Sequence, residues 1–169
     1  MPSLAVESVQ FFERYQLWAM ERVFAAARQA GPATDGGVIP GSKGGGTIYG
    51  LLGHIVDVDI FWLSRWQGNE HTAFQMPGAW ATIPDIEGAW RADLGRRSSY
   101  FAEIDEAELE REYGFYRGDP PTYDRQLIWK TILHAHNHAT HHRAEVSALL
   151  TTVGFPPENI DMLGFLRGQ

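Results

Sequence analysis

Residues 124–154 read DRQLIWKTILHAHNHATHHRAEVSALLTTVG, and this segment predicts the longest helix of the chain. Asp124 is a typical helix N-cap, and Gly154, followed closely by two prolines, is a strong signal for the helix end. We therefore expect one helix from about Arg125 to Val153. It contains a histidine-rich run, which comprises His134, His136, His138, His141 and His142.

Three further segments predict long helices, because large apolar residues recur in them every three or four positions. The caps expected for these helices are Ser3, Thr47 and Asp85. The helices are expected to extend to about Gly31, Gly68 and Ile104. Four long helices in residues 1–169 indicate a single domain of the all-α class, an antiparallel four-helix bundle.

The connections between these helices have different compositions. Residues 31–46 are rich in glycine and predict a mobile loop, while residues 68–84 predict a long connection. Residues 113–122 indicate at most a minor hairpin, and residues 160–166 a short helical tail. The glycine loop differs from a phosphate-binding loop, because Lys43 precedes its last glycines and no strand precedes the loop.

The charge balance disfavours a nucleic-acid partner. The chain has a formal net charge of -7, and Lys43 and Lys130 are its only lysines. The Arg96-Arg97 pair is interpreted as solvated helix surface. No signal segment and no apolar run long enough to cross a bilayer is found, so we expect no membrane partner. The absence of cysteine fits a soluble protein of the reducing cytoplasm.

The histidines of the last long helix have the spacing of a metal site. His138 and His142 lie four residues apart, so their side chains project from one helix face. His54, in the second predicted helix, is the best candidate for a third ligand. His134 competes with His142, because it also lies four residues from His138. Three imidazoles would leave open coordination positions on zinc, nickel, iron, manganese or cobalt.

Two carboxylates lie near this pattern. Glu145 follows His138 by two helical turns and is a candidate fourth ligand, a hydrogen-bond acceptor behind a ligand, or a general base. Alternatively, it is solvated or pairs with an arginine. Asp57 is a candidate to orient the His54 imidazole. The HExxH metallopeptidase motif is absent, because Ala139 occupies the position of its glutamate.

Three segments resemble the DinB superfamily, the DinB/YfiT-like four-helix metal-binding proteins. They are Leu51 to Leu63, Asn137 to Glu145 and Gly154 to Asp161. The resemblance implies that His54, His138 and His142 bind a divalent ion and that the protein is a homodimer. In one departure, Arg143-Ala-Glu145 replaces the Arg-Gly-Gln that is frequent in this superfamily.

The resemblance also implies a metal-dependent transferase or isomerase that uses an exogenous low-molecular-weight thiol and a small-molecule substrate. A protein without cysteine would receive its sulfur from such a cosubstrate. One alternative is a hydrolase in which the ion activates water and Glu145 accepts the proton. Another is a non-catalytic, stress-associated module that binds metal or a ligand. Trp18, Trp62 and Trp129 are candidate walls of the substrate pocket.

Overall fold

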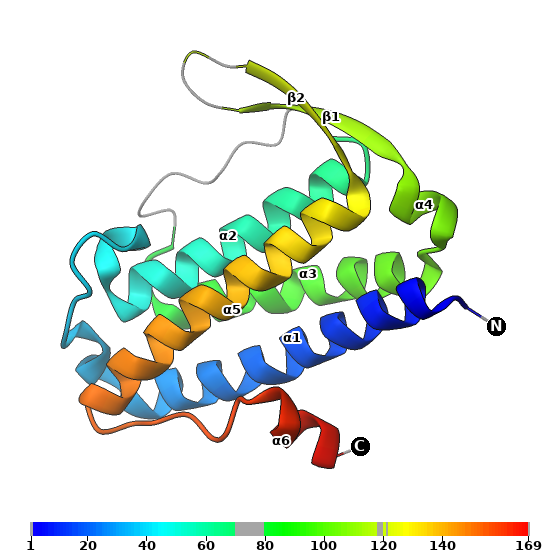
Figure 1. Cartoon of the computed structure of the whole chain (residues 1–169). Helices are drawn as coiled ribbons and strands as arrows, with labels where there is room; N and C mark the ends of the chain where they lie inside the picture. Colours follow the sequence, from blue (N-terminus) through cyan, green and yellow to red (C-terminus); the bar gives the residue numbers. More distant parts are fainter. Residues whose placement is uncertain (1, 70–79, 118–119, 121, 169) are drawn as a thin grey trace.

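The computed structural model describes residues 2–69, 80–117, 120 and 122–168, and four long helices dominate it (Figure 1). They are α1 (Leu4–Ala30), α2 (Ile48–Trp66), α3 (Ile83–Glu103) and α5 (Ile128–Thr152). The predicted four-helix bundle is therefore confirmed. The prediction that the histidine-rich helix is the longest is wrong, because α1 has 27 residues and α5 has 25. Helices α1 and α5 run in one direction, and α2 and α3 run in the other (Figure 1).

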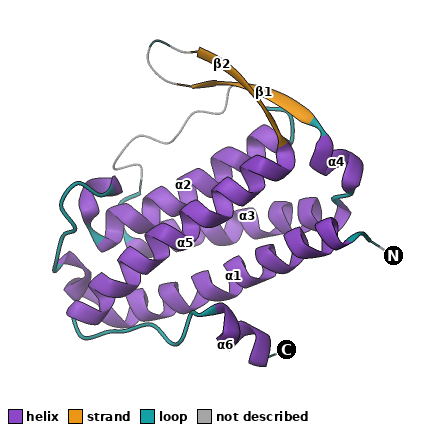
Figure 2. Ribbon diagram, in the orientation of Figure 1, coloured by secondary structure: helices purple, strands orange, loops and turns teal. Residues whose placement is uncertain are grey.

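The shorter elements lie at the two ends of the bundle and beside α1 (Figure 2). A short helix α4 (Glu106–Glu110) leads into the antiparallel hairpin of β1 (Glu112–Arg117) and β2 (Thr122–Leu127). The minor hairpin was predicted, although most of its turn lies outside the described residues. The predicted tail forms α6 (Met162–Arg167). Most of the long connection expected at residues 68–84 also lies outside the described part of the chain.

Two predicted caps are confirmed and two are wrong. The Ser3 hydroxyl accepts a hydrogen bond from the Val6 amide, and the Thr47 hydroxyl accepts one from the Gly50 amide. Helix α3, however, begins after Thr82, which caps it in place of Asp85; the Thr82 hydroxyl accepts from the amide of Asp85.

The predicted cap of α5 is wrong for a different reason. Asp124 lies within β2, opposite Phe115, and α5 starts only at Ile128. The backbone groups of residues 122–127 pair with β1, so this segment extends the hairpin instead of the helix. Leu127 occupies the N-cap position, without a hydrogen bond from its side chain.

The glycine-rich segment before α2 contains two 3-10 turns, η1 (Gly31–Asp35) and η2 (Lys43–Gly46). The predicted loop is thus present, and part of it is regular. Apolar side chains from all four long helices fill the interior in two main clusters, one toward each end of the bundle. No helix among the described residues combines the length and apolar character needed to cross a membrane.

A buried ionic cluster ties the four long helices together near the middle of the bundle. The Arg97 guanidinium of α3 lies 2.6 Å from Glu13 of α1 and 2.8 Å from Asp59 of α2. His136 of α5 completes the cluster, with its Nε2 3.1 Å from a Glu13 carboxylate oxygen. Only 3% of Arg97 is exposed, so its interpretation as solvated surface is wrong. The cluster fixes the face that α5 turns toward α1 and α3.

The pKa values of the two carboxyl groups are shifted in opposite directions, because burial and Arg97 balance differently at each. Burial disfavours the charged form of Glu13, but the Arg97 charge and hydrogen bonds from His136 and Arg97 outweigh it and hold its pKa at about 2. Burial dominates at Asp59 and raises its pKa, although Arg97 opposes this change. Glu13 is therefore the firmly ionised partner of Arg97.

Candidate metal centre

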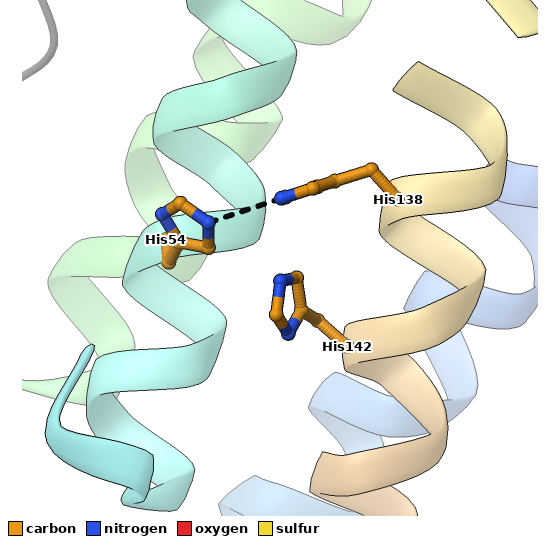
Figure 3. Close-up of side chains that lie close together, drawn as sticks. All are labelled: His54, His138 and His142. Carbon is orange, nitrogen blue, oxygen red and sulfur yellow. Dashed lines mark hydrogen bonds between the residues drawn. The ribbon is translucent and has the colours of Figure 1, made fainter. Parts of the chain in front are cut away.

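Three imidazoles meet between α2 and α5 (Figure 3). His54 projects from the middle of α2, and His138 and His142 project from successive turns of α5. Helices α2 and α5 pack directly against each other, so their facing sides bring the three rings together. One ring nitrogen from each residue lies within 4.8 Å of the others.

The nitrogen spacing matches what one small cation requires. The Nε2 atoms of His54 and His138 lie 3.1 Å apart (Figure 3). Two nitrogens that each lie 2.0–2.1 Å from a tetrahedral zinc ion are separated by about 3.3 Å. The His142 ring centroid lies 4.4 Å from that of His138 and 5.0 Å from that of His54. The three side chains present are therefore a nitrogen donor set of suitable size for a divalent ion.

The surroundings keep two of these rings neutral. Burial, reinforced by the charges of His142 and Lys43, lowers the pKa of His54 to about 4, with Glu145 acting weakly in the opposite direction. Burial and the neighbouring histidines lower the pKa of His138 to about 3. A neutral imidazole has a lone pair to donate, whereas an imidazolium has none. At neutral pH these two residues are consequently ready to act as ligands.

The sequence left open whether His134 or His142 joins His138. His142 is 5% exposed and belongs to the group of three, whereas His134 is exposed and does not. The His134 ring instead packs edge-on against Trp62, with centroids 5.6 Å apart. Helix α2 contacts both residues, but His54 lies beside His138 and His142, whereas Trp62, two turns further along α2, lies beside His134.

Glu145 lies directly behind His142. One carboxylate oxygen is 2.6 Å from His142 Nδ1, and the other accepts a hydrogen bond of 2.8 Å from the Ser42 hydroxyl. Partial burial acts to raise the pKa of Glu145, but the hydrogen bonds from His142 and Ser42 outweigh it and lower that pKa. An ionised Glu145 accepts a hydrogen bond from Nδ1–H of His142. The Nε2 atom then carries the free lone pair that can bind a metal ion.

Comparison with known families agrees with this geometry. The sequence profile described as the DinB family matches residues 38–169, which include all three histidines. The chain belongs to the DinB family. No curated protein matches the chain significantly. Helix α1 precedes the matched DinB region, yet it supplies Glu13 to the buried ionic cluster.

The sequence did not identify the turn of residues 42–46 as part of the surroundings of His54, His138 and His142. Gly44 and Gly50 pack backbone against backbone: a Cβ atom on Gly50 would lie 1.7 Å from the Gly44 carbonyl oxygen. Gly50 precedes His54 by one helical turn, so this contact places residues 42–46 beside the histidines. The run of glycines was the available signal, because it permits such an approach and a φ of 58° at Gly44.

The remaining candidate side chains lie at different distances from the centre. Asp57 is buried but is not part of the histidine group. Trp18 packs against Phe165 of α6, and Trp129 is 38% exposed near the start of α5. Of the three tryptophans predicted to form walls, Trp62 is the one that contacts a histidine of the run. Trp80, which was not singled out, packs against Gly53 beside His54.

Proposed function

We propose that this DinB protein binds one divalent ion through His54, His138 and His142 and uses it in a transfer or isomerisation reaction with an exogenous low-molecular-weight thiol. The observation that carries the proposal is the convergence of three imidazoles from two helices within 4.8 Å. Three protein ligands leave a coordination position for a reactant, which is typical of catalytic centres.

The composition supports an external thiol. The chain contains no cysteine, so a sulfur nucleophile has to arrive with a second molecule. When bound, a divalent ion would supply positive charge that favours the thiolate form of such a molecule near neutral pH. Zinc, nickel, iron, manganese and cobalt all accept imidazole ligands, so the donor set fits each of them.

Glu145 is better suited to positioning His142 than to accepting a proton from water. Its two oxygens are engaged with Ser42 and His142, and its pKa is lowered, which makes it a weaker base. For this reason thiol chemistry is proposed ahead of hydrolysis. A non-catalytic binding role would share the same ion site but produce no turnover.

Metal analysis of untagged protein tests the ion site. The native protein should bind one equivalent of ion, and His138→Ala and His142→Ala should lose this binding. His134→Ala is the matched control, because it removes an exposed histidine from the same helix and should retain the ion. Stoichiometric ion binding by both His138→Ala and His142→Ala would exclude the proposed ligand set.

A second experiment tests the reaction. Metal-loaded protein is assayed with several biological thiols and small electrophiles, and thiol consumption is measured with and without a chelator. We expect turnover that requires both thiol and metal. Turnover of an ester or amide without thiol would favour hydrolysis, and ion binding without any turnover would favour the non-catalytic role.

A further inference from the structure

The turn of residues 42–46 is fixed to both helices of the histidine centre. On the α5 side, the Ser42 hydroxyl donates to Glu145, which in turn contacts His142. On the α2 side, Gly44 lies directly against the backbone of Gly50. These two attachments are made by Ser42 and Gly44, the residues directly before and after Lys43. The backbone at Lys43 is therefore held beside the centre.

Lys43 is exposed, and no ion pair engages it within the described part of the chain. Its side chain branches from the backbone between Ser42, which contacts Glu145, and Gly44, which contacts Gly50, so it starts beside the histidines. Most of the arginine side chains already contact other protein groups. Arg143, for example, donates hydrogen bonds to Gln16 and Thr140. Lys43 is thus available to a ligand that enters the centre.

The charge of the loaded centre favours an anionic ligand. Neutral imidazoles leave the double positive charge of an ion uncompensated, and Lys43 adds one more positive charge nearby. Glu145 is the carboxylate that contacts this group of residues, and its oxygens already accept hydrogen bonds. A ligand that occupies the open position would therefore be drawn more strongly if it carried a second anionic group.

We propose that Lys43 is a specificity-determining residue that selects a thiol cosubstrate carrying a carboxylate. This inference rests on the proposed function, since it names the chemical class of the ligand used at the same centre. The thiol group would face the histidines, and the carboxylate would pair with the Lys43 ammonium. An exposed ion pair of this kind changes a dissociation constant by about two- to fivefold.

The test compares two matched thiols on cobalt-substituted protein. 3-Mercaptopropionate and its neutral amide, 3-mercaptopropionamide, are titrated while the sulfur-to-cobalt charge-transfer absorption is recorded. The ratio of their dissociation constants should favour the acid in the native protein. Lys43→Met should reduce this preference by about two- to fivefold, and Lys43→Arg should restore it. Lys130→Met, which removes the other lysine of the chain, should leave the ratio unchanged.

The outcomes separate this inference from the proposed function. If both thiols bind but Lys43→Met leaves their ratio unchanged, the role of Lys43 is excluded and thiol binding stands. If neither thiol produces the absorption, the proposed thiol function fails. In that case succinate, with two carboxylates, and succinamate, with one, are titrated instead. The change in the cobalt d–d absorption gives their dissociation constants. A carboxylate preference that Lys43→Met removes supports selection of anions by Lys43, and an unchanged preference excludes it.

Discussion

Helix α5 has two buried polar faces that hold their histidines in different ways. On one face, His136 is 2% exposed, stacks between Phe12 and Phe101, and contacts a carboxylate that Arg97 already neutralises. On the other face, His138 has imidazoles as its close polar neighbours. The comparison shows that partners, more than burial, separate a structural histidine from a candidate ligand.

The two faces also differ in charge. The His136 face is a closed cluster in which cationic and anionic groups compensate each other. The His138 face gathers nitrogen donors and lacks a carboxylate among the members of the triad. Such a donor group gains stability when a cation binds, whereas Arg97 already supplies the cation of the ionic cluster. Removing a residue from each face should therefore have distinguishable effects.

The largest effect is expected on the His136 face. Arg97→Met leaves Glu13 and Asp59 buried without their cation, which should lower the free energy of unfolding by about 3–5 kcal/mol. Urea unfolding followed by circular dichroism measures this change. Arg96→Met is the control, since Arg96 is partly exposed and should cost at most about 1 kcal/mol. Equal effects of the two substitutions would contradict the proposed importance of the cluster.

On the other face, Glu145→Gln should weaken metal binding without unfolding the protein. The amide is a poorer acceptor for the His142 Nδ1 proton, so ion affinity should fall about 10- to 100-fold. Competition with a chromogenic chelator measures this affinity. Glu158→Gln, a change at an exposed glutamate, should have no effect. A variant with native ion affinity but lost turnover would instead support a role for Glu145 as a base.

Acid should destabilise the metal-free protein through the His138 face. The folded-state pKa values of His54 and His138 are lowered to about 4 and about 3, below the ordinary value of 6.5. Between pH 6.5 and about 3 the unfolded chain therefore binds more protons, and stability falls as pH falls. Because both rings are half-buried, we expect a loss of about 1–2 kcal/mol between pH 7 and pH 5.

Urea unfolding in the presence of a chelator at the two pH values measures this loss. In a His54→Gln/His138→Gln double variant the difference should be much smaller. Glu13 does not contribute in this window, because its lowered pKa makes its stabilisation disappear only below pH 4.5, toward about 2. An unchanged pH dependence in the double variant would assign the acid sensitivity to other groups.

The smallest effect is expected from Ser42→Ala, which removes one of the two hydrogen bonds to Glu145. Glu145 keeps its contact with His142, so ion affinity should fall only about two- to fivefold. The chelator competition used for Glu145→Gln measures this difference, with exposed Ser99→Ala as the control. A loss as large as that of Glu145→Gln would contradict this expectation and show that Glu145 orients His142 only when Ser42 holds it.

Much of the architecture was predictable because it depends on local patterns. Apolar spacing identified the four long helices, and Ser3 and Thr47 were correctly identified as caps. The start of α5 was not, because Asp124 is a typical N-cap residue but lies in β2. The deciding factor was pairing with β1, a contact between distant segments that no local pattern encodes.

The candidate site was predictable to a similar extent. The four-residue spacing singled out His138, but periodicity alone could not choose between His134 and His142. The alignment of α2 along α5 made that choice, because it places His54 beside His142 and Trp62 beside His134. Arg97 fell on the apolar stripe of its helix, which was a signal of burial, but its partners Glu13 and Asp59 resemble ordinary surface residues in the sequence.

The backbone contact between Gly44 and Gly50 has a consequence for engineering this protein. Each position tolerates only a hydrogen atom, because a methyl group on either residue would overlap the backbone of the other. Randomising residue 43 while retaining both glycines would change the side chain beside the histidine centre without displacing the backbone of the turn. A small library at this one codon is therefore the most economical starting point for redirecting ligand preference.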